Sequence, residues 1–227
     1  MTNDQRHGRR RRDRSYVTRL AGIVVSVLAV GGGFGAATSL VNAISGSFAD
    51  LESRAYTTSG WSGAEIASTL LDSGWAWAGL AVAAGWLVTR TEESRPVALA
   101  QGAAAGVLAL LAATAAYSIV DTIRSGGRFP WYESEVVRWF ASVTFGGPLG
   151  CVGACVRRPG VIGLLARLTV PVGAAVQMVV LLPGRNEVIE AIGKTVVWMA
   201  AAVSIGFVVA RFLLVRRRRS ETVAKSP

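Results

Sequence analysis

Apolar residues fall into six long stretches along the chain, and the polar residues gather between them and at the two ends. A helix that crosses the roughly 30 Å apolar core of a bilayer needs about 20 such residues. None of the stretches has an acidic residue at its middle. The pattern predicts an all-α polytopic membrane protein with a membrane domain at 20–215. The six predicted transmembrane helices are 20–44, 74–91, 97–120, 136–156, 161–183 and 191–215.

The beginning of the second span has two interpretations. The run Ser62-Gly63-Ala64-Glu65 has the S-x-x-E form of a helix capping box. A helix that begins at Gly63 and runs straight into the second span fits this signal. A short separate helix over 63–72 that lies on the outer surface fits it as well.

Charge is concentrated at the ends of the chain. The net charge of the 227 residues is +10, and residues 1–19 and 211–227 each carry +5 of it. The middle is neutral and apolar, so the tails 1–19 and 216–227 are predicted to be basic cytoplasmic segments. This distribution excludes a disordered chain, a disulfide-rich mini-protein and a typical soluble enzyme. It also argues against nucleic acid as a partner, since nucleic-acid-binding proteins carry basic residues on a folded face.

Lys and Arg resist translocation and therefore mark the cytoplasmic segments of a membrane protein. With both termini inside, the inner segments hold 17 of the 24 Lys and Arg residues, and the outer segments hold four. The outer segments also hold nine of the 14 acidic residues. Both termini are therefore predicted to be cytoplasmic. Arg outnumbers Lys 22 to 2, which is typical of a GC-rich bacterial genome, so the expected location is a bacterial inner membrane.

Residues that carry chemistry are scarce. The only histidine, His7, lies in the basic N-terminal tail, which excludes Ser-His-Asp catalysis and histidine metal sites. Cys151 and Cys155 are four residues apart and are expected to pack between helices, because two ligands do not make a zinc site. The chain contains no phosphate-loop motif. We expect neither an enzyme nor a bound metal or cofactor.

One cation falls inside a predicted span. Arg167 lies about six residues into the fifth stretch, or about 9 Å deep at 1.5 Å per residue. Its side chain is long enough to snorkel to the inner surface. Only Glu92, Glu93 or a lipid phosphate is expected to face it there. Arg167 is therefore predicted either to snorkel or to contact an anion or a lipid headgroup.

Glycines four residues apart recur in spans one, three and four, at 31 and 35, at 102 and 106, and at 146 and 150. Such pairs let helix backbones approach closely, so helix packing alone accounts for them. Pro148 and Pro171 are expected to kink spans four and five.

A transport site is a second interpretation of the same glycines. Three spans in each half give the halves opposite orientations, and glycine clusters lie at matching places in spans one and four. Interrupted helices at matching places of inverted repeats mark midplane sites in transporters. The candidate substrate-binding residues are Gly33, Ser39, Asn42, Thr144, Gly147 and Gln177.

From Trp139 to Pro183 the chain has a glycine-proline helix, then the tight turn Arg157-Arg158-Pro159-Gly160, then an apolar helix with one proline. This segment resembles small uncharacterised multi-pass membrane proteins of actinobacteria. The resemblance covers the second half of the chain. It implies a multi-pass membrane fold and no catalytic or binding residues, because those families carry no established activity.

Two functions fit these observations. The first is a non-enzymatic accessory or interaction component of the cell envelope, which the lack of buried titratable groups favours. The second is a small permease or a membrane subunit of a transporter, with a midplane site between spans one and four. The expected partners are the lipid bilayer and anionic lipids beside the arginine-rich tails, where each charge contributes about 1 kcal/mol. A membrane protein is a further candidate partner.

Overall fold

In a computed structural model, every regular element of the described residues is an α-helix, which confirms the all-α part of the predicted fold class. The structure describes residues 3–50, 63–92, 94–126, 133–180 and 187–224. These residues form seven helices, namely α1 (Asn3–Asp50), α3 (Gly63–Leu71), α4 (Gly74–Thr89), α5 (Arg95–Ser125), α6 (Glu133–Cys155), α7 (Val161–Val180) and α8 (Glu187–Ala224).

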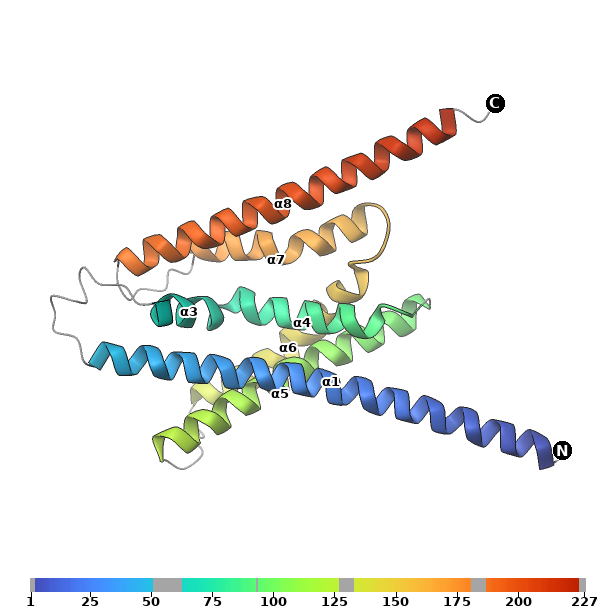
Figure 1. The fold of residues 1–227 in the computed structure, drawn as a ribbon, viewed down its shortest axis with the longest axis horizontal. Helices are drawn as coiled ribbons and strands as arrows, with labels where there is room; N and C mark the ends of the chain where they lie inside the picture. The colour runs from blue at the N-terminus through green and yellow to red at the C-terminus, as the bar shows by residue number, and fades with distance from the viewer. Residues whose placement is uncertain (1–2, 51–62, 93, 127–132, 181–186, 225–227) are drawn as a thin grey trace.

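The long helices run back and forth along one axis (Figure 1). Each of the six predicted apolar stretches coincides with one of them: α1, α4, α5, α6, α7 and α8. Both termini lie at the same end of the bundle, together with the α4–α5 and α6–α7 connections. We call this the terminal end of the bundle.

Four helical segments are long and apolar enough to cross a membrane: Ala21–Ser45, Arg95–Ser125, Val161–Val180 and Ala191–Arg218. The apolar helix α4 has only 16 residues. The 23-residue α6 contains Arg138, Pro148 and four glycines, which lower its mean hydropathy. Helix length and composition alone therefore define a helical bundle of the membrane type, with four clear candidate spans.

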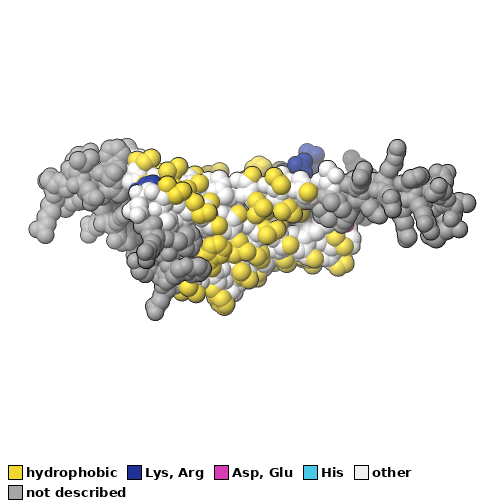
Figure 2. Space-filling view, turned by 90° about the horizontal axis from the view of Figure 1, so that it is seen from below, with side chains coloured by type: hydrophobic (Ala, Val, Ile, Leu, Met, Phe, Trp, Pro, Cys, Tyr) yellow, Lys and Arg dark blue, Asp and Glu magenta, His cyan; other side chains and the backbone are white. Residues whose placement is uncertain are grey.

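Large apolar side chains cover the outside of the bundle. Phe140, Val203 and Phe207 are each about two-thirds exposed or more, at 72%, 72% and 65%. In the face seen in Figure 2, hydrophobic side chains extend along the bundle with few charged ones among them. An apolar surface this continuous is suited to lipid rather than to water.

Helix α3 is separate from α4, so the predicted straight helix from Gly63 is wrong. The chain breaks at Ser73, whose φ of −78° and ψ of 143° are extended. The short separate helix of the alternative is confirmed as α3, which packs between α1 and α8 and is half-buried (Figure 1). Its position at the outer surface of the membrane stays a prediction. Ser62 of the predicted capping box lies outside the described residues.

Helix α5 is the centre of the packing, in contact with α1, α4 and α6. Its small residues make close approach possible: a side chain at Gly31 or Gly35 of α1 would collide with α5 carbonyls. On another side of α5, Gly146 and Gly150 of α6 lie directly against its backbone. The glycine pairs are therefore close-packing contacts, as the simpler interpretation predicts. The core here is formed by Val27, Leu80, Ala81, Ala84, Ala105, Ala109, Leu110 and Ala113.

Helices α7 and α8 form a hairpin beside this core. Ala174 and Met178 of α7 and Val197 of α8 make a second apolar cluster, against which Leu70 and Trp75 pack. The hairpin contacts the rest of the bundle through α3, α4 and α6. The hairpin therefore has its own apolar cluster, which lies beside the core formed around α5.

The basic ends continue the helices. The backbone of α1 is helical from Asn3, and that of α8 is helical to Ala224. Most of each predicted tail, 1–19 and 216–227, is thus an extension of the adjacent apolar helix. The side chains of Arg9–Arg12 lie outside the described residues.

Candidate functional site: an arginine-lined pocket at the terminal end

The residues predicted to form a midplane site do not come together. Helix α1 continues through its glycine cluster, and α6 continues through Pro148. The expected helix breaks are therefore wrong. Gly33 faces outward with no atom near its missing Cβ, and Thr144 is exposed. Gly147 meets only Val107 of α5. Among the described residues, α1 and α6 each pack on α5 and share no extensive contact.

Gln177 has a structural role at the start of α4. Its Oε1 accepts a hydrogen bond of 2.9 Å from the backbone N–H of Trp75. The first N–H groups of a helix lack partners within the helix, so this side chain caps α4 from the neighbouring α7. Gln177 therefore joins the hairpin to the central bundle.

Asn42 joins three helices at the end of the bundle opposite the termini. Its Nδ2 donates to Asp72 Oδ2 and to the Tyr117 hydroxyl, each at 3.1 Å. Its Oδ1 accepts from Ser68 Oγ at 2.6 Å. Ser39, one turn away, is 1% exposed, and its Oγ has no hydrogen-bond partner among the described residues. This cluster holds α1, α3 and α5 together.

Two adjoining pockets lie at the terminal end, around the α6–α7 turn. The first has a volume of about 480 Å³, and we call it the turn pocket; it is lined by Arg157, Arg158, Pro159, Gly160, Val161, Arg167, Arg211, Phe212, Val215 and Arg216. The second has a volume of about 550 Å³, and we call it the cleft pocket; it is lined by Trp86, Arg90, Val156, Arg157, Arg167, Phe207, Val208 and Arg211.

A tight turn brings the first arginines to this place. Helix α6 ends at Cys155, whose carbonyl accepts a hydrogen bond of 3.0 Å from the N–H of Arg158. Gly160 has a φ of +80°, which favours glycine, and α7 begins at the next residue. Gly163 then lies against the Arg158 carbonyl, where a side chain would collide with it. The turn therefore fixes the backbone from which the arginine side chains extend.

Arg167 reaches back from α7 to the end of α6. Its Nε donates a hydrogen bond of 2.9 Å to the carbonyl oxygen of Val156. The Arg157 guanidinium likewise donates to the carbonyl oxygen of Arg90, at the end of α4. Cations are favoured at helix C-termini, where carbonyls lack partners. A guanidinium has five N–H donors, so both arginines keep donors for a ligand.

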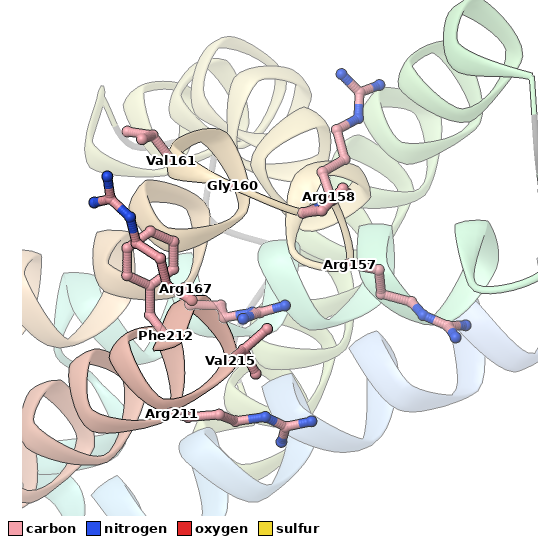
Figure 3. A pocket seen from close by; sticks show the side chains of 10 residues that line it. Arg157, Arg158, Gly160, Val161, Arg167, Arg211, Phe212 and Val215 are labelled. Atoms are coloured by element: carbon pink, nitrogen blue, oxygen red, sulfur yellow. The ribbon is translucent and has the colours of Figure 1, made fainter. Parts of the chain in front are cut away.

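Helix α8 supplies the opposite wall. The residues of α8 that line the pockets lie in pairs four positions apart, and the two members of each pair lie on the same side of the helix. They are Phe207, Val208, Arg211, Phe212, Val215 and Arg216. In Figure 3, the side chains of Arg167 and Arg211 extend in the same direction, whereas that of Arg158 points away from them. In the described part of the chain, no hydrogen bond or ion pair is found for the Arg211 guanidinium.

The two pockets are electropositive. None of their lining residues, all of them described, is acidic. Glu92 lines a third pocket beside the turn, where its Oε1 accepts a hydrogen bond of 3.1 Å from the N–H of Ser94. Glu92 thus does not line either pocket with Arg167, and Glu93 lies outside the described residues.

The chemistry that this lining favours is anion binding. Guanidinium groups match phosphate and carboxylate oxygens with paired hydrogen bonds. Trp86 and Phe207 add an apolar wall to the cleft pocket, and Phe212 and Val215 add one to the turn pocket. Such a combination suits an amphiphile with an anionic head.

Metal-ligating residues do not gather in the part of the chain that the structure describes: no three His, Cys, Asp or Glu side chains are close enough to hold an ion. Cys151 and Cys155 are free thiols. Cys151 Sγ lies 3.5 Å from the Leu99 carbonyl, as a weak donor between α6 and α5. The expected packing role agrees with this position.

Arg167 is the one residue of this site that the sequence alone singles out, as a cation inside an apolar stretch. Arg157, Arg158, Arg211 and Arg216 join it in the turn pocket. The sequence signal is that apolar residues 207, 212 and 215 lie at helical spacing from arginines 211 and 216 along the last helix. Nothing in the sequence indicates which turn that face meets.

Comparison with protein-family models, curated proteins and solved structures found no match to this chain.

Proposed function

We propose that this chain is a non-enzymatic protein of the bacterial cell membrane that holds the phosphate headgroup of an anionic lipid in an arginine-lined site at the inner surface. The observation that carries the proposal is that Arg157, Arg167 and Arg211 line both pockets, without an acidic residue in either lining. Its broader role would be that of an accessory component of the envelope, able to associate with a membrane protein.

The proposed topology has six spans. Helix α6, with 23 residues, is about 34 Å long at 1.5 Å per residue, which is enough for a bilayer core of about 30 Å. Helix α4 is about 24 Å long, and α3 extends the path of the chain beyond it. Arg138 near the start of α6 lies over the Tyr117 ring, 4.6 Å from its centroid, a contact that favours a cation at the membrane border.

The proposed orientation places the terminal end in the cytoplasm. The arginines of the two pockets then join the basic ends on the side that the positive-inside rule favours. Anionic lipids of the inner leaflet attract such residues by about 1 kcal/mol each. The position of the arginine pockets and the distribution of basic residues both favour a site in the inner leaflet.

A transport site between spans one and four would need an interrupted helix in each half, and α1 and α6 are continuous. The glycines concerned lie in helix contacts or face outward.

Lipid retention tests the proposal. The full chain is purified in a neutral detergent and exposed to mixed phosphatidylglycerol and phosphatidylcholine, and the bound lipid is measured by native mass spectrometry. We expect phosphatidylglycerol to be retained selectively, and Arg211→Gln to weaken its binding about fivefold, which corresponds to about 1 kcal/mol. The control is Arg124→Gln, which removes an exposed arginine at the other end of the bundle. Equal retention of both lipids by the unaltered protein would overturn the proposal.

A further inference from the structure

The two pockets are not independent sites. Arg157, Arg167 and Arg211 line both of them, so the two pockets adjoin at these three residues. Each pocket also has arginines that the other lacks: Arg158 and Arg216 in the turn pocket, and Arg90 in the cleft pocket. Positive charge therefore lies at the centre and on both sides.

Each pocket also has its own apolar wall. On α8, Phe207 faces the cleft pocket and Phe212 faces the turn pocket. These residues are five positions apart, or about 7.5 Å along the helix axis. Apolar surface thus flanks the shared arginines on two sides, so the acyl chains of a bound lipid can extend from the site in two directions.

We infer that the site takes a lipid in which two phosphatidyl groups are joined by a short polar linker, with one phosphate in each pocket. This inference rests on the proposed anionic-lipid site and names its ligand class.

Charge favours two phosphates over one. Six arginines line the two pockets, whose linings contain no acidic residue; they are Arg90, Arg157, Arg158, Arg167, Arg211 and Arg216. One phosphodiester carries a single negative charge, so the positive charge of the arginines in the other pocket is left without a counter-charge. Two phosphodiesters place one charge in each pocket, where arginines can donate paired hydrogen bonds. Basic pockets between helices on the cytoplasmic side are the setting in which such headgroups bind.

The two apolar walls favour a lipid whose acyl chains form two separate sets. A lipid diphosphate has both phosphates at the end of one chain, so one wall would remain unused. A bis-phosphatidyl lipid has acyl chains on both sides of its linker, as the two walls require. Each volume, about 480 and 550 Å³, lies within the range of about 300–1,000 Å³ usual for small-molecule sites.

The test compares three lipids on the full chain in phosphatidylcholine nanodiscs: tetraoleoyl cardiolipin, dioleoyl phosphatidylglycerol and a polyprenyl diphosphate. Binding is titrated by native mass spectrometry. We expect one cardiolipin per chain, bound about tenfold more tightly than phosphatidylglycerol and than the diphosphate. Thermal unfolding of every variant is measured in parallel, so that a folding defect is recognised.

Variants separate the two pockets. Arg90→Gln and Arg158→Gln each alter one pocket, and each should reduce cardiolipin affinity toward that of phosphatidylglycerol. Each should weaken phosphatidylglycerol binding less than it weakens cardiolipin binding, because a single phosphate can use the other pocket. Arg211→Gln, which alters both pockets, should weaken both lipids.

The outcomes distinguish this inference from the proposed function. If phosphatidylglycerol binds as tightly as cardiolipin, the two-phosphate inference fails and the anionic-lipid site stands. If the polyprenyl diphosphate equals cardiolipin, the placement of chains on two sides fails. If none of the three binds in preference to phosphatidylcholine, the inference and the proposed function fail together.

Discussion

The Nε of Arg167 donates a hydrogen bond of 2.9 Å to the carbonyl oxygen of Val156, eleven residues earlier in the chain. This contact supplies a hydrogen-bond partner from α7 for a carbonyl at the end of α6. It also holds the side chain of Arg167 in place, and Arg167 lines both pockets. Arg167 therefore has two separable roles, one in the fold and one in the proposed site.

Those roles predict different behaviour for two neighbouring arginines. Arg167→Ala should lower the free energy of unfolding by about 1.5–3 kcal/mol even without anionic lipid, because a hydrogen bond to a charged group is lost. Arg211→Ala should leave stability in neutral detergent nearly unchanged and should reduce the stabilisation that added phosphatidylglycerol provides, by up to about 1 kcal/mol. Thermal unfolding with and without this lipid measures both effects. The same loss for both variants in neutral detergent would contradict the division of roles.

The glycines of α6 predict opposite effects at two nearby positions. A Cβ at Gly150 would collide with the backbone of α5, so Gly150→Ala should destabilise the bundle by about 1–3 kcal/mol. A Cβ at Gly147 would lie 3.9 Å from Val107 Cγ2, an ordinary contact. Gly147→Ala should leave stability unchanged or raise it by up to about 1 kcal/mol, because alanine favours helix. Circular dichroism melts in detergent compare the two, and equal melting temperatures would show that α6 does not pack this way.

The hydrogen bonds of Asn42 predict that its loss is costly. Asn42→Ala should destabilise the protein by about 1–3 kcal/mol, since it removes the partner of Ser68 and Tyr117. Ser39→Ala is the matched change on the same helix. It removes a buried hydroxyl without a partner in the described residues, so it should be neutral or stabilising. A larger loss for Ser39→Ala than for Asn42→Ala would contradict this arrangement.

The proposed orientation predicts where a reporter is active. A reporter enzyme that works only outside the cytoplasm should be inactive after residue 227. Inserted after Gly126, at the end of α5, it should be active. The reverse pattern would contradict the six-span topology with both termini inside, and with it the placement of the arginine site in the inner leaflet.

The sequence predicts the helices well, because each apolar stretch had to form one. The predicted span 161–183 begins at the same residue as α7, and 136–156 lies within a few residues of α6. The break at Ser73 was missed because it depends on the extended conformation of one residue. No pattern of apolar positions specifies that conformation.

The sequence does not specify which helices and side chains contact one another. Glycines at 146 and 150 fit both a helix contact and a helix break, and only the position of α5 decides between them. Arg167 stood out because it is a lone cation in an apolar stretch. Arg211 is 44 positions further along the chain, and its place beside Arg167 depends on how the α7–α8 hairpin closes.

The most direct test of the account is an experimental structure of the full chain in nanodiscs that contain phosphatidylglycerol and cardiolipin. We expect phosphate density within hydrogen-bond distance of the guanidinium groups of Arg167 and Arg211, on the side of the membrane that holds both termini. Arginines that face water, with no headgroup between α7 and α8, would contradict it.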